Sequence, residues 1–572
     1  MIAQRLQNKT WWEALRAASR ELAESKPPRW LPFGVIAIPA LLLFVQITHN
    51  WVNIPYWDEW GLIARLRLSL QSGTLRPHDL FDQHNDSRFL VPQLILLPLA
   101  RVTHWDLRAE MFVIFATVCL ISWVLWGLLG KIENLPRPAR FGCLLVCNCL
   151  LFSPLQYETW LWGINLSLVL PPLFLLLALR VNLSALSLPA KVGLNILLCF
   201  ASTFSNANGM GNWLLAFPAF VHGGARPDRR WFWYGVYLAA AIGTLLLFFW
   251  DYQSHASASP LLQSPALLLK YFFCLLGAPV AIALGTSAWI AGLCLSCLFL
   301  SLSGTALFRS ASEQRRHAAY AFTAIGCYSG LAAAATAVGR VGLRFEWSLG
   351  SRYTTFSIYL PIAAIGLAAL YFSRTDDRGN SATGIGPRRV IAALIVIAIL
   401  AGSLATYGEG MKGMSRTRKE RARGRAALLF SKVLPHNPNL KILCSNPAMM
   451  IGRYRELLRS DMARSPFVAP SSIPKLQPRP GMSRTGGYFR VCELKEDRLR
   501  MKGWALLEER GAAPFVLFAD RTRGTEAVPF SVAPTRNESP KGAPHGVRDC
   551  GFEIKIEAPK LPEGRVEISA WA

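Results

Sequence analysis

Between residues 30 and 407 the chain alternates between long apolar runs and short polar loops. About 20 apolar residues in a helix are needed to cross the roughly 30 Å hydrocarbon layer of a bilayer. Most of these runs approach that length, and several are interrupted by proline. The pattern predicts a polytopic α-helical membrane protein with about 11–12 spans, near residues 30–49, 109–130, 140–153, 160–179, 188–205, 209–222, 231–250, 266–284, 288–308, 318–338, 354–372 and 390–407.

One proline pair, Pro171–Pro172, and two single prolines, Pro218 and Pro279, fall inside these runs. A broken helix is tolerated at membrane depth only where neighbouring groups satisfy its free backbone atoms. The breaks therefore indicate a bundle with an internal cavity.

The pattern changes at both ends of the apolar region. Residues 1–29 predict a short cytoplasmic amphipathic helix, and residues 408–482 a basic, helical connector followed by a proline-rich linker. From residue 483 to 572, six short runs alternate apolar and polar positions between turn residues, which is typical of a small β-sandwich domain. Cys492 and Cys550 could form a disulfide there if the domain is exported.

Composition agrees with a membrane location, because 52% of the residues are hydrophobic and only 17% are charged. The net charge of +26 could suggest nucleic-acid binding. No soluble module with a basic helix and base-stacking aromatics is visible, so we expect no nucleic-acid partner. Basic loops that face anionic lipid headgroups explain the charge better.

Lysine and arginine in the short loops predict a cytoplasmic N-terminus and place the loop 50–108 outside. After residue 250 the charges nearly balance, and the orientation depends on whether 266–284 spans or is re-entrant. We favour the re-entrant interpretation, with eleven spans and an external C-terminal domain. It places Arg340, Arg344 and Arg352 on the same side as Asp58.

The external loop opens with Asp58 and Glu59 between Trp57 and Trp60. Two adjacent carboxylates above a bilayer can act as a general base or hold a divalent cation such as Mg²⁺ or Mn²⁺. A solvated pair of loop acids is the alternative, but the flanking tryptophans favour a site. Glu158, the acid of the next external loop, could complete a catalytic or metal-binding set with them.

Two further clusters could bind phosphate. His84, Asn85, Asp86 and Arg88 lie just before an apolar run, where Arg88 could hold phosphate and His84 could shuttle a proton or bind metal. Helix capping by Asn85 or Asp86, with Arg88 reaching the headgroups, is equally consistent.

The second cluster is the glycine-rich loop that holds Arg340, Arg344, Arg352 and Tyr353. A cytoplasmic basic loop is the alternative for these arginines. The polar stretch 205–209 is a third candidate for the cavity floor, although a capped tight turn explains it as well.

An apolar span followed by an external Asp-Glu loop, a second external acid, many spans and a soluble C-terminal domain resembles the GT-C superfamily of membrane glycosyltransferases. The blocks QYETWLWGIN, FSNANGMGN and GSRYTT also look like those of bacterial membrane proteins of this type. The resemblance covers about residues 30–410, where Asp58 and Glu59 match the position of the family's acidic motif.

The resemblance implies an inverting glycosyltransferase in the bacterial inner membrane. It would use a polyprenyl-phosphate sugar donor, with Asp58 as base, and an envelope glycan, lipid or protein as acceptor in the periplasm. The C-terminal domain would bind the acceptor or cover the site. A transporter or flippase for a lipid-linked or anionic substrate would use the same residues, and a non-enzymatic scaffold would need none of the acids.

Overall fold

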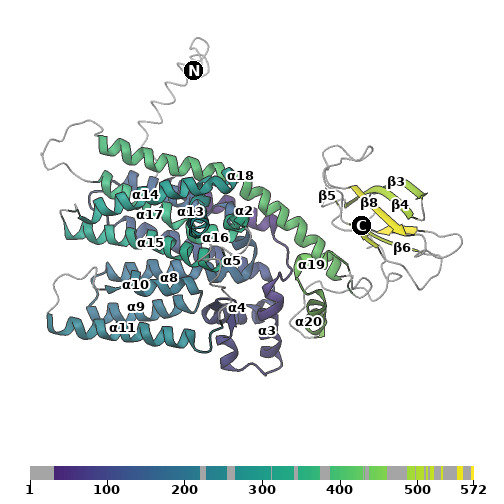
Figure 1. Ribbon diagram of the computed structural model, residues 1–572, viewed down its shortest axis with the longest axis horizontal. Helices are drawn as coiled ribbons and strands as arrows, with labels where there is room; N and C mark the ends of the chain where they lie inside the picture. Colours follow the sequence, from purple (N-terminus) through teal and green to yellow (C-terminus); the bar gives the residue numbers. More distant parts are fainter. Residues whose placement is uncertain are drawn as a thin grey trace, which may run out of the picture.

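The computed structural model describes residues 31–218, 227–253, 264–308, 310, 312–340, 345–373, 387–429, 431 and 437–459, together with C-terminal strand residues. The predicted N-terminal helix, Arg344, Cys550 and most of the proline-rich linker lie outside the described residues. Long helices run roughly parallel to one another in a single bundle (Figure 1). In the described part, nine helical segments are long and apolar enough to cross a membrane, as expected of a multi-pass membrane protein.

The helices in chain order are α2 (Leu31–Asn50), α3 (Ala64–Gln71), α4 (Leu90–Thr103), α5 (Leu107–Leu129), α6 (Arg137–Leu151), α7 (Tyr157–Leu161), α8 (Leu166–Asn182), α9 (Leu188–Thr203), α10 (Asn212–Leu215), α11 (Pro227–Phe249), α13 (Pro265–Ala281), α14 (Ala288–Phe308), α15 (Glu313–Arg340), α16 (Ser351–Ser357), α17 (Tyr359–Phe372), α18 (Pro387–Leu429), α19 (Leu440–Leu443) and α20 (Pro447–Arg459).

The strands fall into three antiparallel sheets. A two-stranded hairpin near α4 is made by β1 (Gln83–His84) and β2 (Ser87–Arg88). The C-terminal region contains a four-stranded and a three-stranded sheet, whose packing as a sandwich stays a prediction. Their strands are β3 (Gly486–Lys495), β4 (Arg498–Leu507), β5 (Gly511–Ala512), β6 (Val516–Asp520), β7 (Phe530–Val532), β8 (Gly551–Glu557) and β9 (Ile568–Trp571).

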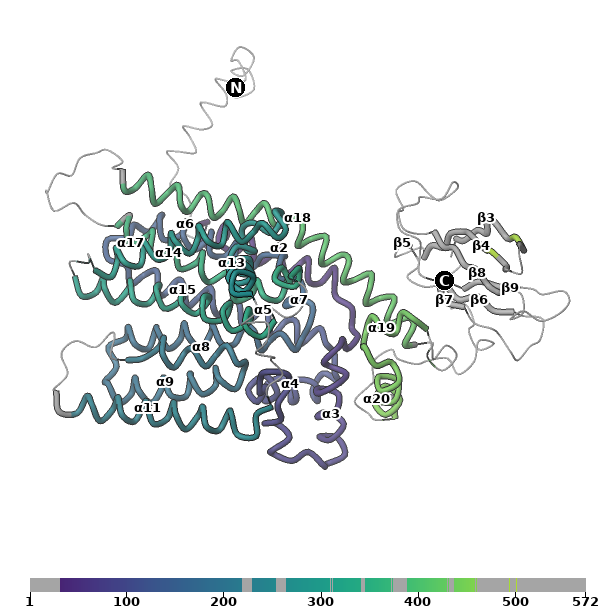
Figure 2. The backbone as a smooth tube through the Cα atoms, viewed as in Figure 1, coloured from purple at the N-terminus to yellow at the C-terminus, as the bar shows by residue number. Residues whose placement is uncertain are grey.

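The segment 207–218 crosses the bundle without forming a long helix. Helices α8, α9 and α11 lie side by side next to it (Figure 2). Buried polar side chains bond to its backbone, since Asn182 donates to the Ala216 carbonyl at 2.9 Å and Asn195 donates to it at 3.2 Å. Asn212 also donates, at 2.9 Å, to the Pro171 carbonyl inside the unbroken α8. Polar neighbours thus allow both the broken segment and the proline pair at membrane depth.

Gly209 explains why this broken segment carries glycine. A Cβ atom at this position would lie 2.1 Å from the Ser202 carbonyl oxygen, which is too close for any other residue without a shift of the backbone. Asn206 caps the turn by accepting from the Asn208 amide at 3.1 Å. The capped turn expected for 205–209 is therefore present.

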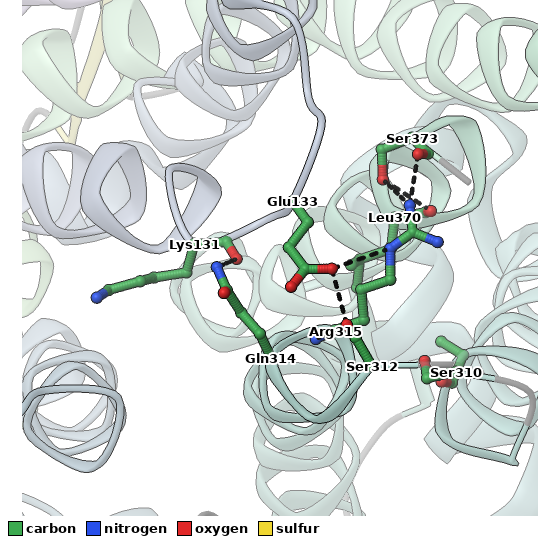
Figure 3. A network of polar contacts seen from close by, with 9 residues as sticks. Lys131, Glu133, Ser310, Ser312, Gln314, Arg315, Leu370 and Ser373 are labelled. Atoms are coloured by element: carbon green, nitrogen blue, oxygen red, sulfur yellow. Dashed lines mark hydrogen bonds and ion pairs between the residues drawn. The ribbon is translucent and has the colours of Figure 1, made fainter. Parts of the chain in front are cut away.

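At the end of the bundle away from α3 and α4, Arg315 links three elements (Figure 3). Its guanidinium lies 3.6 Å from Glu133, in the loop after α5, and donates to the carbonyl of Ser373 after α17. Ser312 donates to Glu133 at 2.7 Å. The residues that precede α15 therefore lie at this end.

Residues at the opposite end of the bundle indicate where the chain lies before and after α13. Tyr252 after α11 and Arg340 at the end of α15 line one cavity, and Gly285 before α14 lies near Ser351 at the same end. The described chain therefore lies at this end of the bundle both before α13, at Tyr252, and after it, at Gly285. This arrangement favours the re-entrant interpretation, and the total of eleven spans stays a prediction beside the nine candidates of the described part.

Gly277 and Gly292 allow α13 to pack closely against α14. A Cβ atom on Gly292 would lie 1.8 Å from the Phe273 carbonyl oxygen, whereas Gly304 on the same helix has open space around it. We expect Gly292→Ala to lower the thermal unfolding midpoint of the detergent-purified protein, because the two helices must separate. Gly304→Ala is the matched control and should leave the midpoint unchanged or raise it. Equal midpoints for both variants would contradict the close packing.

Candidate functional site

The loop after α2 turns Asp58 toward the inside of the molecule. Trp57 has a left-handed backbone conformation (φ 45°), and its amide donates to the Leu443 carbonyl of α19 at 2.7 Å. A π-helical turn, Glu59–Ile63, follows at once. The Trp60 indole donates to the Pro55 carbonyl at 2.8 Å, which closes the loop on itself.

Asp58 lines a cavity of about 410 Å³ at this end of the bundle. Its walls come from segments far apart in the chain: the β1–β2 hairpin, the start of α8, the turn before α10, the ends of α11 and α15, and α16. The lining includes His84, Asn85, Asp86, Ser87, Trp162, Asn165, Asn206, Asn208, Tyr252, Val338, Arg340, Arg352, Tyr353 and Phe356.

Asp58 and His84 form a carboxylate–imidazole pair. Asp58 Oδ2 lies 3.3 Å from His84 Nε2, and the side chain of Asp58 remains 38% exposed. Burial acts to raise the pKa of Asp58, but the contact and charge of His84, together with Arg352 and Arg340, lower it overall. Asp58 is therefore an ionised carboxylate at neutral pH.

Two guanidinium groups face the same cavity. Arg340 ends α15, and Arg352 lies in the first turn of α16. The Arg352 Cζ atom is 5.2 Å from the ring centre of Tyr353 and 6.0 Å from that of Trp162, so aromatic faces hold it in place. Two arginines beside an ionised acid can bind an anion and leave the acid available to a hydroxyl group.

The β1–β2 hairpin presents its tip to the cavity. Asn85 takes the left-handed conformation (φ 50°) that a two-residue turn requires, and both Asn85 and Asp86 line the cavity. The Ser87 hydroxyl accepts from the Ala207 amide at 3.1 Å, which joins the hairpin to the broken segment. The hairpin thus places His84 opposite Asp58.

Arg88 is not among the residues that line the cavity, and its role as a phosphate ligand stays a prediction. Its guanidinium is buried and donates to three backbone carbonyls, those of Phe248 (2.8 Å), Phe81 (2.5 Å) and Trp250. The carbonyls of Phe248 and Trp250 lie at the end of α11, where helix carbonyls lack amide partners within the helix, and the Phe81 carbonyl ends the 3₁₀ turn Pro77–Phe81. Arg88 therefore anchors the hairpin to α11.

Glu59 does not line the cavity that Asp58 lines, and its expected action together with Asp58 stays a prediction. Its side chain is fully buried and accepts from the Tyr56 amide at 2.8 Å. It lies near Glu110, which pairs with the buried Arg67 at 2.5 Å. Burial, and then the charge of Glu110, raise the pKa of Glu59 to about 8, against the lowering effects of the Tyr56 amide, Arg421 and Arg67.

Glu158 also lies outside the cavity lining, and its expected catalytic role stays a prediction. Its carboxylate accepts from the Arg352 amide at 3.1 Å, and its own amide donates to Ser351 at 3.0 Å. A carboxylate that receives a first-turn amide caps the helix and is stabilised by the helix dipole. Glu158 therefore holds the start of α16, from which Arg352 extends.

The three acids expected to hold a divalent cation do not converge, since only Asp58 lines the cavity. Within the described ranges, no three His, Cys, Asp or Glu side chains lie close enough together to hold a metal ion. The residues present therefore do not fit the expected Mg²⁺ or Mn²⁺ site.

Sequence reasoning missed several cavity residues, including Trp162, Asn165 and Tyr252. The first two lie in the block QYETWLWGIN, whose polar and aromatic residues interrupt an apolar region. That interruption was a usable signal. Tyr252 follows α11 with no distinguishing pattern around it.

No protein-family model matches this chain, and no curated protein matches it significantly. A similar solved structure is the archaeal oligosaccharyltransferase AglB from Archaeoglobus fulgidus, in complex with an inhibitory peptide and a dolichol-phosphate. The identity is 12% and the TM-score 0.39, over 78% of this chain and 60% of that one. The present chain thus spans about three fifths of that protein's length. At this level of similarity, function has to be argued from the cavity itself.

The buried Glu59 makes stability depend on pH. A glutamate in the unfolded chain titrates near 4.5, whereas the pKa of folded Glu59 is about 8. Its contribution to stability is therefore complete below pH 4.5 and is lost as the pH rises toward 8. We expect the wild-type unfolding midpoint to fall between pH 5 and 8, and Glu59→Gln to reduce that fall. Glu456→Gln, on the exposed side of α20, is the control and should leave the pH dependence unchanged.

Proposed function

We propose that this protein is an inverting glycosyltransferase of the bacterial inner membrane. It would move a sugar from a polyprenyl-phosphate donor to a hydroxyl group of an envelope glycan, lipid or protein on the periplasmic face. The main support for the proposal is the cavity at one end of the helix bundle. It contains the ionised carboxylate of Asp58 beside the imidazole of His84, together with two arginines.

The arginines suit the donor. A lipid phosphate that leaves the sugar C1 needs its negative charge stabilised, and Arg340 and Arg352 supply two guanidinium groups in one cavity. Val338 and Phe356 give that part of the cavity an apolar wall. The phosphate would therefore bind at the arginines, with its polyprenyl chain among the helices.

Asp58 and its neighbours suit the acceptor. The acceptor oxygen would attack C1 and pass its proton to Asp58, while the bond from C1 to the phosphate oxygen breaks and its electron pair leaves with the polyprenyl phosphate. His84 would orient the carboxylate. Asn165, Asn206 and Asn208 offer amide donors and acceptors to sugar hydroxyls, and Trp162 offers an aromatic face.

Transport of a lipid-linked anion is a second candidate function. One observation favours it, namely that the broken segment 207–218 begins in the cavity and crosses the bundle, as discontinuous helices do in many transporters. In a transporter, however, Asp58 would bind or couple the substrate without any sugar being transferred.

Asp58→Asn separates the two functions. We expect this variant to lose at least about 100-fold in transfer rate, because the general base is removed, while donor binding persists. The assay would supply the full-length protein in nanodiscs with polyprenyl-phosphate sugars and envelope extract, and would measure released polyprenyl phosphate by mass spectrometry. Asp251→Asn is the control, because Asp251 is exposed and asparagine also tolerates its left-handed backbone conformation. This variant should retain full activity.

Transport without phosphate release in the wild type would contradict the enzyme and support the second function. Full activity in Asp58→Asn would contradict the assignment of the base.

Removal of a cavity guanidinium should weaken donor binding. We expect Arg340→Gln to raise the dissociation constant for polyprenyl phosphate by roughly 10-fold, since a charge-assisted hydrogen bond contributes about 1.5–3 kcal/mol. Binding can be measured by native mass spectrometry in detergent. Arg101→Gln, on the exposed face of α4, should bind as tightly as the wild type, and an equal loss in both variants would contradict a phosphate site at Arg340.

A further inference from the structure

We propose that the segment 437–459, which contains α19 and α20, is a positioning element for Asp58. It folds back over the loop 55–61 and holds that loop in the conformation that directs Asp58 into the cavity. This inference rests on the proposed function, because it assigns to a distant segment the placement of the base.

A backbone hydrogen bond provides the first contact. The Leu443 carbonyl accepts from the Trp57 amide at 2.7 Å, one residue before Asp58. Trp57 has a φ of 45°, a conformation that is strained for a bulky side chain and persists only where the surroundings hold it. Leu443 itself is fully buried. Without α19, Trp57 would relax and Asp58 would turn with it.

Arg453 of α20 provides the second contact, directly after Asp58. Its Nη1 atom donates to the carbonyls of Trp60 and Gly61, in the wide π-helical turn Glu59–Ile63. The two contacts thus hold the backbone immediately before and shortly after Asp58 in the sequence. The side chain of Asp58 is 38% exposed, so its own burial does not fix its direction.

An apolar interface joins the two parts. Met450, Ile451, Tyr454 and Leu457 of α20 are buried in one cluster with Trp60, Ile63 and Leu66 of the loop and α3. Figure 2 shows α18 continuing beyond the bundle to α19 and α20. Near the end of that extension, Arg421 donates to the Leu161 carbonyl and lies 4.2 Å from the ring centre of Tyr56. The segment is therefore docked over the whole loop.

The test uses full-length protein in nanodiscs with three substitutions. Arg453→Ala removes both carbonyl contacts, and Arg453→Lys keeps a donor for one of them. Arg455→Ala is the matched control, because Arg455 lies on the exposed face of the same helix. Two quantities are measured for each: kcat and KM of sugar transfer, and hydrogen exchange of peptides that cover residues 55–63.

We expect Arg453→Ala to lower kcat roughly 10- to 100-fold, as displacement of a catalytic group by about 1 Å does. KM for the donor should stay within about twofold, because Arg340 and Arg352 are untouched. Exchange at residues 55–63 should accelerate, while peptides over the β1–β2 hairpin remain as in the wild type. Arg453→Lys should recover most of kcat, and Arg455→Ala should match the wild type in every measurement.

A merely structural role would lower the amount of folded protein and leave kcat per folded molecule unchanged, which would overturn the proposal. Equal effects of Arg455→Ala and Arg453→Ala would overturn it as well. If the wild type transfers no sugar, the proposed function fails, and the exchange measurement still decides whether α20 holds the loop. Unchanged exchange in Arg453→Ala would then refute the positioning role on its own.

Discussion

Carbonyl groups at the ends of helices lack amide partners, and in this protein arginine side chains supply many of the missing donors. Arg88 bonds to the carbonyls that end α11, Arg315 to the one that follows α17, and Arg421 to Leu161 at the end of α7. Arg140 donates likewise to Trp126 near the end of α5. A helix C-terminus carries partial negative charge, so a buried guanidinium is stabilised there as the carbonyl is satisfied. These four arginines thus satisfy carbonyls at the ends of four helices.

These contacts with carbonyls determine which arginine side chains remain available to bind an anionic substrate. An arginine that donates to backbone carbonyls has fewer N–H groups left for a phosphate and is held away from the cavity by those contacts. Arg352 differs, because its guanidinium donates to the hydroxyl of Tyr353 at 3.4 Å and lies near aromatic rings. Arg352 is therefore held in direction by contacts that leave most of its donors able to meet an anion.

The helices could be predicted from sequence because their cause is local. Apolar length decides whether a segment can cross a bilayer, and the asparagines of 206–212 mark the broken segment 207–218 by interrupting an apolar run. Whether residues 266–284 span or are re-entrant was harder to predict, because the basic residues in the loops after residue 250 are nearly balanced between the two sides.

The site was harder to predict, because a residue type does not reveal its partner. Asp58 and Glu59 are adjacent, yet successive positions in a helical turn point about 100° apart, so one meets the cavity and the other the core. Arg88 carries the same group as Arg352, and only the fold shows that backbone carbonyls occupy it. The contact of α20 with Trp60 spans nearly 400 residues of chain and leaves no local pattern.

Charged side chains also lie behind the walls of the cavity, where they hold its parts in place. Glu158 fixes the start of α16, Arg88 fixes the hairpin and Arg453 fixes the loop, and none of the three enters the cavity. A cavity assembled from distant segments has no single rigid element to define it, so its geometry depends on bonds made behind each wall. The positions of the lining side chains therefore depend on residues behind the walls, such as Glu158, Arg88 and Arg453. Substitutions of these residues should change the activity of the site, while the residues that line the cavity stay the same.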